Sequence, residues 1–239
     1  MKLTVFGATG TLGRVLTAMA LADGHEVTAV SRGGFGGGLR GGAKGVLRDV
    51  RGDVLDPVVA HRAVAGADAV LCTLGAGRKG NVRAPGTANI LAGMKAHGVR
   101  RFVCQTTLGA GDSAGNLNFF WKYVMFGLLL RPAMADHEAQ EALIRTSDTD
   151  WTIVRPAAFT DGPETGDAIH GFSGTSPVGL TLKVSRADIA RFMLGQLTDT
   201  QYLRQTPGLS YSEAAVVPNA WAQPLGPRPP KASLTSHQA

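Results

Sequence analysis

The chain has 239 residues, of which 44% are hydrophobic and 18% charged, and its formal net charge is +6. This length and composition suffice for one globular domain with a full hydrophobic core and leave little room for a second. The basic excess is local, because five Lys or Arg residues face a single acid, Asp49, between positions 31 and 52. A local excess suits a small anion better than a nucleic acid duplex, so nucleic-acid binding is not expected.

The N-terminal residues and the two cysteines indicate in which cellular compartment the protein is expected. The hydrophobic run in MKLTVFGATG is too short for a signal peptide, so a cytoplasmic location is expected. Cys72 and Cys104 have neither metal-ligand nor CxxC spacing, and each lies in an apolar, strand-like run. We therefore expect two reduced, buried thiols and no metal site.

Short apolar runs alternate with amphipathic stretches, which predicts an α/β fold with a parallel sheet. Residues 2–6 are expected to form a strand, 11–24 a helix and 25–31 a second strand. Eight glycines between positions 33 and 45 disfavour a helix, because each costs about 1 kcal/mol there. We expect a mobile loop in their place.

The alternation resumes after this loop. Strands are expected at 45–53, 67–75, 99–107, 150–156 and near 201–211, and helices after Pro57, at 88–98, in a long stretch ending near 146, and at 185–199 with Ser185 as N-cap. Residues 1–218 are interpreted as a single domain. The proline-rich residues 219–239 are interpreted as a disordered tail.

A glycine-rich turn, GATGTLG, follows the first strand and opens the first helix. Gly7 allows a tight turn, Gly10 lets the backbone approach a pyrophosphate, and Gly13 permits close packing of helix on strand. The free N–H groups and partial positive charge of the helix N-terminus attract the same anion. We therefore predict a dinucleotide site; the alternative is a tight turn that binds nothing.

The end of the second strand carries Ser31 and Arg32, where an NAD site normally has an acid. An arginine there suits a ribose 2′-phosphate, so NADP is predicted in preference to NAD. Arg40 and Lys44, in the glycine-rich segment that begins here, either fold over the phosphate as a basic flap or belong to a solvated loop.

Further candidates lie at other predicted strand ends. Asp53 either hydrogen-bonds the adenine amino group or caps the turn before Pro57, and residues 73–77 form a second glycine turn at the same edge. Thr106 and Thr107 end the fifth strand, where their hydroxyls would lie near a nicotinamide. The alternative for both threonines is β-propensity alone.

The most apolar segment is NFFWKYVMFGLLL at 118–130, which has a central lysine and is shorter than the about 20 residues that span a bilayer. It is interpreted as a core or dimer helix, or as an apolar wall over a substrate pocket beyond the fifth strand. The same segment is the candidate surface for a homodimer or a protein partner, and no membrane partner is expected.

A family resemblance rests on five stretches of the sequence, namely GATGTLGRVL, RGDVLDP, GADAVLCTLG, DWTIVRPAAFTDGP and VSRADIARFML. Through them, residues 2–212 resemble the atypical short-chain dehydrogenase/reductase superfamily, in the NmrA-like branch that also holds biliverdin IXβ (flavin) reductase-like enzymes. The resemblance implies a Rossmann-type doubly wound parallel sheet, a small C-terminal region that shapes the substrate cleft, and NADP(H) as ligand. It places Gly7, Thr9, Gly10, Thr11 and Leu12 at the pyrophosphate, Arg32 at the 2′-phosphate, Asp53 and Val54 at the adenine, Leu74 and Gly75 at the ribose, Thr107 by the nicotinamide and Pro156 behind its ring.

The chain departs from this superfamily in its catalytic pair. The typical YxxxK pair combines a tyrosine that protonates a carbonyl with a lysine that lowers the pKa of that tyrosine. Here the residues four positions after the three tyrosines are Gly127, Thr206 and Ala215. Ketone reduction and sugar-nucleotide epimerisation by that mechanism therefore lose their support.

Hydride transfer to an acceptor stacked on the nicotinamide needs no dedicated acid, because solvent can supply the proton. We therefore predict an NADPH-dependent reductase of a flat conjugated molecule of flavin, quinone or tetrapyrrole type. Thr107 would orient the nicotinamide or the acceptor. His137 is the candidate proton donor because histidine titrates near neutral pH. Tyr123, with the adjacent Lys122, is a second candidate of the same standing, and His170 is a weaker one.

The alternative function is non-catalytic, namely an NADP-binding redox sensor of NmrA type that passes the redox state of its dinucleotide to a protein partner. The missing YxxxK pair fits both functions. A methyltransferase using S-adenosylmethionine is disfavoured, because Arg32 stands where an acid for the ribose hydroxyls would be needed.

Overall fold

The computed structural model describes residues 1–36, 44–172, 174–176 and 178–213. Within them, eight strands form a sheet in the order β3-β2-β1-β4-β5-β6-β10-β8, in which only β10 and β8 are antiparallel neighbours. The strands are β1 (Lys2–Phe6), β2 (Glu26–Ser31), β3 (Val46–Arg51), β4 (Ala69–Cys72), β5 (Arg101–Gln105), β6 (Asp150–Pro156), β8 (Ile169–His170) and β10 (Gly208–Ser210). A separate parallel pair consists of β7 (Ala158–Thr160) and β9 (Lys183–Ser185).

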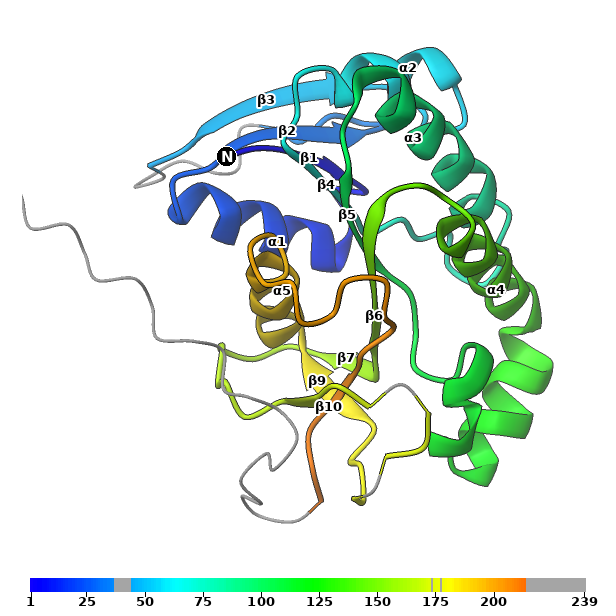
Figure 1. Ribbon diagram of the computed structural model, residues 1–239. Coiled ribbons are helices and arrows are strands. Elements are labelled where there is room, and N and C mark those ends of the chain that lie inside the picture. Colours follow the sequence, from blue (N-terminus) through cyan, green and yellow to red (C-terminus); the bar gives the residue numbers. More distant parts are fainter. Residues whose placement is uncertain (37–43, 173, 177, 214–239) are drawn as a thin grey trace, which may run out of the picture.

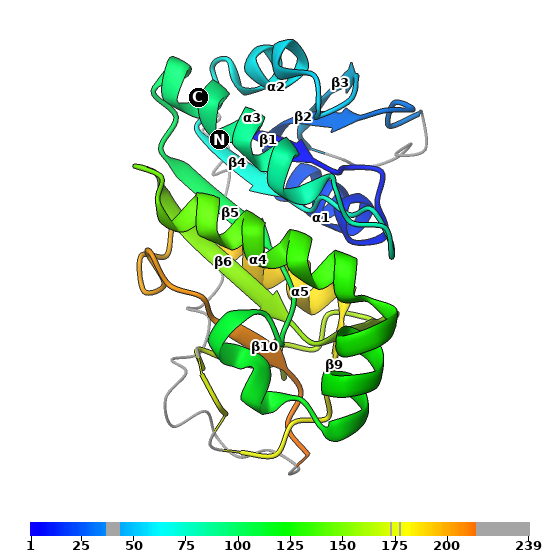
Figure 2. The same ribbon diagram turned by 90° about the vertical axis from the view of Figure 1, so that its right-hand side faces the viewer.

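Helices cover both faces of the sheet (Figures 1 and 2). One face carries α1 (Thr11–Ala22) and α5 (Arg186–Gly195), and the other carries α2 (Pro57–Val64), α3 (Arg83–His97) and α4 (Arg131–Arg145). A 3-10 helix, η1 (Gly111–Asn116), and a π-helix, η2 (Phe120–Leu129), connect β5 to α4. This arrangement confirms the predicted Rossmann-type doubly wound fold, in which ligands bind where the strand order reverses, here between β1 and β4.

The inner strands are buried on both sides, which explains why they read as continuous apolar runs. Leu3 and Val5 of β1 belong to the half of the core beneath α1 and α5, whereas Phe6 belongs to the half beneath α2, α3 and α4. Both Cys72 and Cys104 are free and buried, as expected. The two halves of the core thus fix the helices against the sheet and so position the carboxyl ends of the strands.

Most predicted elements are confirmed with shifted bounds. Pro57 opens α2 after Asp56, whose side chain accepts the Val58 N–H at 2.9 Å. Ser185 caps α5 by accepting the Asp188 N–H at 3.0 Å. The long helical stretch expected before residue 146 is instead divided into η1, η2 and α4, and the short strands β7, β8 and β9 had no clear signal in the sequence.

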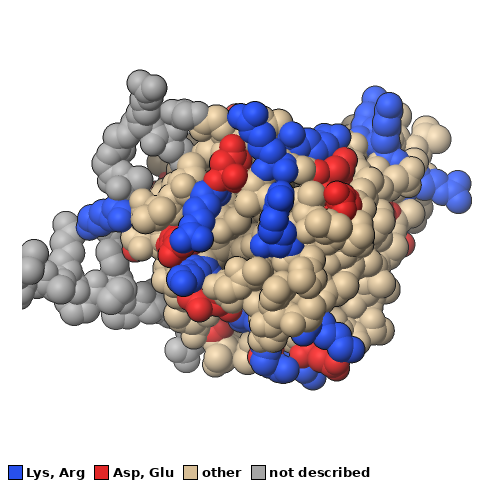
Figure 3. All heavy atoms as spheres, turned by 90° about the horizontal axis from the view of Figure 1, so that it is seen from above, with Lys and Arg blue, Asp and Glu red and all other residues tan. Residues whose placement is uncertain are grey.

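The predicted glycine-rich loop and tail are only partly covered. Positions 37–43, with Arg40, and 214–239 lie outside the described residues. Among the described residues, no helix is long and apolar enough to cross a membrane. The local basic excess is partly paired, since Arg48 Nη2 lies 2.8 Å from Glu26 Oε1. On the face shown in Figure 3, Lys and Arg side chains are interspersed with Asp and Glu.

Candidate functional site

A cavity of about 1000 Å³ opens at the carboxyl ends of the parallel strands, beside the reversal of strand order. Its lining brings together most of the residues that the sequence singled out, namely Gly7, Thr9, Gly10, Thr11, Leu12, Arg32, Asp53, Val54, Leu74, Gly75, Thr106, Thr107 and His137. Pro156 and Tyr123 are not part of this lining.

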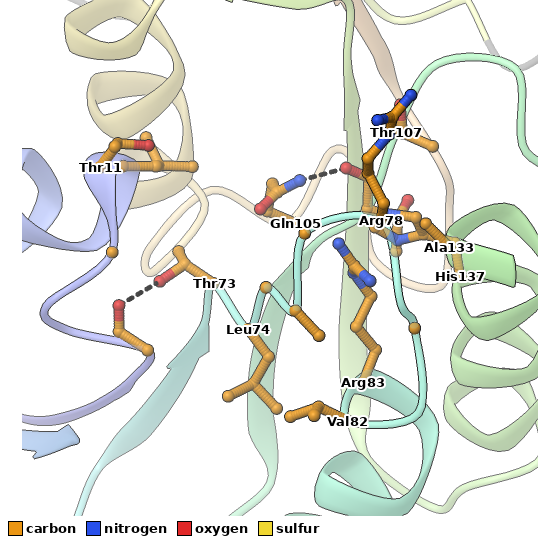
Figure 4. A pocket seen from close by; sticks show the side chains of 18 of the residues that line it. Thr11, Thr73, Leu74, Arg78, Val82, Arg83, Gln105, Thr107, Ala133 and His137 are labelled. Atoms are coloured by element: carbon orange, nitrogen blue, oxygen red, sulfur yellow. Dashed lines mark hydrogen bonds between the residues drawn. The ribbon is translucent and has the colours of Figure 1, made fainter. Parts of the chain in front are cut away.

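The turn after β1 leaves no space for side chains. A Cβ at Gly7, whose φ is +79°, would lie 2.5 Å from the carbonyl oxygen of Thr73, and a Cβ at Gly13 would overlap the carbonyl oxygen of Gly7. Thr73, after β4, donates its hydroxyl to the carbonyls of Phe6 and Gly7 at 3.1 and 3.3 Å (Figure 4). These contacts fix a backbone cradle of the kind that a pyrophosphate requires.

The N-terminus of α1 faces the same cradle. Gly10 is its N-cap and supplies no side-chain acceptor, and the first turn contains no acidic residue. Thr11 and Leu12 line the cavity. The first N–H groups of α1 are therefore available to an anion, and the helix dipole adds about 0.3–1 kcal/mol of attraction.

The cavity is lined at the end of β2 by Ser31 and Arg32. Ser31 Oγ is buried and has no hydrogen-bond partner within the described part of the chain. An unsatisfied buried hydroxyl costs about 1–3 kcal/mol, which a ligand oxygen at this position would relieve. Arg32 and Lys44 are exposed, and Lys44 is not part of the lining.

The residues after β3 and β4 form an apolar floor with one carboxylate. Asp53 Oδ1 accepts the N–H group two residues later at 3.0 Å, whereas the helix cap that precedes Pro57 is Asp56. A Cβ at Gly86 of α3 would lie 2.8 Å from Val54 Cγ1 and 3.0 Å from Leu74 Cδ1. The helix therefore packs directly against the two side chains at which the resemblance places the adenosine.

Thr106 and Thr107, after β5, have different surroundings. The buried Thr106 hydroxyl donates to Glu141 Oε1 at 2.8 Å, and Glu141 also binds Arg155, with Arg155 Nη2 to Glu141 Oε2 at 2.6 Å. Burial alone would lower the pKa of Arg155, but Glu141 and Asp112 raise it above its usual value. Thr107 is only half-buried, and its hydroxyl makes one long contact of 3.3 Å to the next carbonyl. The Thr107 hydroxyl is therefore the more available of the two.

His137 lies on the buried face of α4 and lines the cavity. Burial, and then the charge of Arg83, lower its pKa to about 3. The imidazole is therefore neutral at neutral pH. Its Nδ1 atom has no hydrogen-bond partner among the described residues.

The other two candidates for a proton donor, Tyr123 and His170, lie outside the cavity lining. Tyr123 is 55% exposed, and the Lys122 ammonium lies 5.5 Å from its ring centroid. His170 is buried in β8, where its Nδ1 lies 2.9 Å from the Tyr202 hydroxyl. Neither side chain is placed among the residues predicted to hold the dinucleotide.

Three basic residues of the cavity lining, Arg78, Lys79 and Arg83, were missed in the sequence. They fall within six positions immediately after the glycine turn at 75–77. Three basic residues so close together, directly after the carboxyl end of a buried strand, could have indicated that they face the ligand site. The helix expected at 88–98 begins five residues earlier, at Arg83, and this brings the side chain to the cavity (Figure 4).

The far end of the cavity has an apolar wall. The lining there includes Leu117, Trp121, Phe126 and Leu130 around η2, Met134 of α4, Phe159 of β7 and Leu182. None of the residues of η2 is buried, so the segment is not a core helix of this chain. Phe119 and Leu128, which are not in the lining, are 74% and 73% exposed. The predicted apolar wall thus describes the side of residues 118–130 that faces the cavity, whereas Phe119 and Leu128 lie on the exposed side.

Comparisons with known proteins agree with this geometry. A family model described as NAD(P)H-binding matches residues 7–200. An uncharacterized protein of Mycobacterium tuberculosis is 36% identical over 104 residues, which is 43% of this chain and 12% of that protein. The 2-alkyl-3-oxoalkanoate reductase of Stenotrophomonas maltophilia is 34% identical over 114 residues, which is 45% of this chain and 33% of that protein. The matches thus span a small part of these relatives' length.

Solved structures share the fold. ChuY, described as an anaerobillin reductase from Escherichia coli O157:H7, has a TM-score of 0.70 at 23% identity, and the match covers 91% of this chain and 100% of ChuY. A short-chain dehydrogenase/reductase of Veillonella parvula, in complex with NADP, has a TM-score of 0.69 at 18% identity, and the match covers 87% of this chain and 94% of that one. The family model thus agrees with the predicted dinucleotide binding, and these structures share the predicted fold.

Proposed function

The chain belongs to the NAD(P)H-binding family, and from this membership we propose that it is an NADPH-dependent reductase that transfers hydride to a flat, conjugated small molecule of flavin, quinone or tetrapyrrole type. Membership of this family implies a nicotinamide cofactor. Our proposal adds the preference for NADP over NAD and the chemical class of the acceptor.

The observation that carries the proposal is the apolar compartment of the cavity. A dinucleotide sensor needs only a groove for its cofactor, whereas a reductase also needs space for an acceptor beside the nicotinamide. Trp121, Phe126 and Phe159 line that space together with aliphatic side chains. Aromatic and aliphatic surfaces of this kind suit a flat conjugated ring system and exclude water from it.

The cradle residues fit the cofactor because a turn that excludes a Cβ at Gly7 and Gly13, the first N–H groups of α1, and a Ser31 hydroxyl without a partner among the described residues all face one cavity. We assign Gly7, Thr9, Gly10, Thr11 and Leu12 to the pyrophosphate, Ser31 and Arg32 to the 2′-phosphate, Asp53 and Val54 to the adenine, Leu74 and Gly75 to the ribose, and Thr106 and Thr107 to the nicotinamide end. Pro156, which the resemblance places behind the nicotinamide ring, does not line the cavity and is left out of this assignment. When bound, the cofactor supplies the hydride.

The residues at the nicotinamide end position the reactants and do not supply a proton. The Thr107 hydroxyl is free to orient the acceptor, because Thr106 carries the contact to Glu141. His137 holds no titratable proton at neutral pH, so its proposed part changes from proton donor to neutral hydrogen-bonding group. Tyr123 is exposed outside the lining, and the proton comes from solvent.

The test is NADPH oxidation by the purified protein with flavin mononucleotide, menadione or biliverdin as acceptor, with the NADPH dissociation constant measured on the same sample. Turnover above the protein-free rate is expected with at least one acceptor. Trp121→Ala, which opens the apolar wall, should lower kcat/KM and leave NADPH affinity unchanged. Phe120→Ala is the matched control, because Phe120 precedes Trp121 in η2 but is 55% exposed and outside the lining.

Tight NADPH binding without turnover on any acceptor would overturn the reductase proposal. The redox-sensor function would then be favoured, because it requires dinucleotide binding alone. The exposed side of 118–130, with Phe119 and Leu128, would be the surface to mutate in a search for a protein partner.

A further inference from the structure

Arg83, the first residue of α3, brings a buried positive charge to the cavity. Its side chain is 9% exposed, and the residue is part of the cavity lining. Its Nε and Nη1 atoms have no hydrogen-bond partner among the described residues. Burial lowers the pKa of Arg83, yet a guanidinium keeps its charge in proteins. An acceptor for these two N–H groups would therefore lower the cost of burying the guanidinium.

The acid paired with Arg83 is Asp136 of α4, and Arg83 Nη1 lies 3.5 Å from Asp136 Oδ2. Both oxygens of Asp136 are already in use. Oδ2 accepts the N–H groups of Val82 and Arg83 at 3.2 and 3.0 Å, and Oδ1 accepts that of Ala84 at 3.0 Å. Asp136 thus caps α3 in place of Val82, which has no polar side chain. The carboxylate thus serves mainly the helix backbone and is only a distant ion-pair partner of Arg83, whose Nε and Nη1 have no hydrogen-bond partner among the described residues.

A second unsatisfied group lies beside this charge. His137 Nδ1 is buried without a partner in the described part of the chain, and the charge of Arg83 is one of the two causes that lower the pKa of His137. Figure 4 shows the Arg83 and His137 side chains pointing toward the same part of the cavity, with Thr11 on the opposite side. A guanidinium donor and a neutral imidazole nitrogen, which donates or accepts according to its tautomer, therefore face one space away from the pyrophosphate cradle.

The charged residues of the cavity lining near Arg83 and His137 are all positive among the described residues. The described lining residues include four cations, Arg32, Arg78, Lys79 and Arg83, and one acid, Asp53. Arg32 and Asp53 belong to the end that we assign to the adenosine. Arg78, Lys79 and Arg83 belong to the rest of the lining, where the described residues include no acid, and the Asp136 that pairs with Arg83 is not part of the lining. This excess of positive charge favours an anionic ligand there.

We propose that the acceptor carries a carboxylate that binds Arg83, with His137 beside it, an inference that rests on the proposed reductase function. The parallel N–H groups of a guanidinium match the two oxygens of a carboxylate. The flat part of the same molecule then lies against Trp121 and Phe126. The substrate class is accordingly a conjugated carboxylic acid, and a neutral quinone is a poorer ligand.

The test compares two flat probes that differ only in charge, anthraquinone-2-carboxylate and anthraquinone-2-carboxamide, bound to the NADP⁺-loaded protein and measured by calorimetry. The wild-type protein should bind the carboxylate more tightly by about 10–100-fold, the range expected for a charge-assisted hydrogen bond. Arg83→Gln should remove this preference and leave amide affinity within about 2-fold. Arg83→Lys should restore part of it. Arg62→Gln, which removes an exposed arginine of α2, is the control for net charge.

Several results would overturn the carboxylate site. One is the absence of a preference for the carboxylate in the wild-type protein, which requires no variant to fold. Another is an equal loss for both probes in Arg83→Gln, and a third is a loss of NADPH affinity, which would assign Arg83 to the cofactor. Because binding is measured without turnover, a carboxylate preference in a protein that never oxidises NADPH would keep this site and reject the reductase function.

Discussion

The preference for NADP over NAD is tested most directly at Arg32. The residue follows β2, lines the cavity, and lies next to Ser31, whose buried Oγ has no partner among the described residues. Arg32→Ala removes the only lining cation at this end of the cavity within the described chain and leaves the glycine cradle intact. The cradle contacts are common to NADPH and NADH, so the substitution should separate the two cofactors.

The magnitude follows from the exposure of Arg32. A hydrogen bond to a charged group contributes about 1.5–3 kcal/mol when it is shielded, and solvent reduces this for an exposed guanidinium. We therefore expect a loss of about 1–2 kcal/mol in NADPH binding, or about 5–30-fold in Kd. NADH has no 2′-phosphate, so its Kd should change by less than about 2-fold.

Both constants are measured by titrating the purified variant with NADPH and NADH at two salt concentrations. The NADPH effect should shrink at the higher salt, because exposed charges are screened. Arg48→Ala is the matched control, since Arg48 is an exposed arginine of the same basic region that pairs with Glu26 and does not line the cavity. Equal losses for NADPH and NADH would refute the assignment and place the 2′-phosphate elsewhere.

Three further perturbations address the cradle, the buried ion pair and the neutral histidine. Gly7→Ala forces a side chain into a φ of +79° and should weaken NADPH binding more than about 10-fold while lowering the melting temperature. Glu141→Gln leaves Arg155 without its main buried partner and should cost about 3–5 kcal/mol in urea unfolding, unlike the exposed Glu138→Gln. The folded-state pKa of His137 is about 3, so the unfolded chain binds the extra proton below about pH 6.5. Stability should therefore fall by up to about 1.4 kcal/mol per pH unit toward pH 3, and His137→Gln should reduce this slope.

The dinucleotide cradle was predictable because its glycine spacing is local. Gly7, Gly10 and Gly13 stand between a short apolar strand and an amphipathic helix, and a Cβ at Gly13 is excluded by the carbonyl oxygen of Gly7 in the same turn. A Cβ at Gly7 is excluded by Thr73, which follows β4 and is distant in the chain, so this contact could not be predicted from the turn alone.

The start of α3 was not predictable from its own residues. Val82 occupies the N-cap position and offers no acceptor, so local capping signals are missing. The acceptor comes from Asp136, 53 residues further along the chain from Arg83. Expecting the helix at residue 88 omitted its first turn, and with it the buried arginine that lines the cavity.

The buried face of α4 connects the start of α3 to the ends of β5 and β6, beside the cavity. Its polar residues Asp136, Gln140 and Glu141 recur at helical spacing, and such residues ordinarily indicate a solvent-exposed face. Here Gln140 Nε2 donates to Thr87 Oγ1 of α3 at 2.9 Å, and Glu141 holds Thr106 and Arg155 at the ends of β5 and β6.

One helix thus joins a neighbouring helix to two strand ends through buried hydrogen bonds that fix their relative positions. Several buried side-chain atoms have no hydrogen-bond partner among the described residues, and those that belong to the cavity lining are on Ser31, Arg83 and His137. Ser31 lies at the end that we assign to the 2′-phosphate, so Arg83 and His137 are the two that remain for another ligand. In the proposed complex, the carboxylate of that ligand accepts from Arg83 and completes the hydrogen-bond network when it binds.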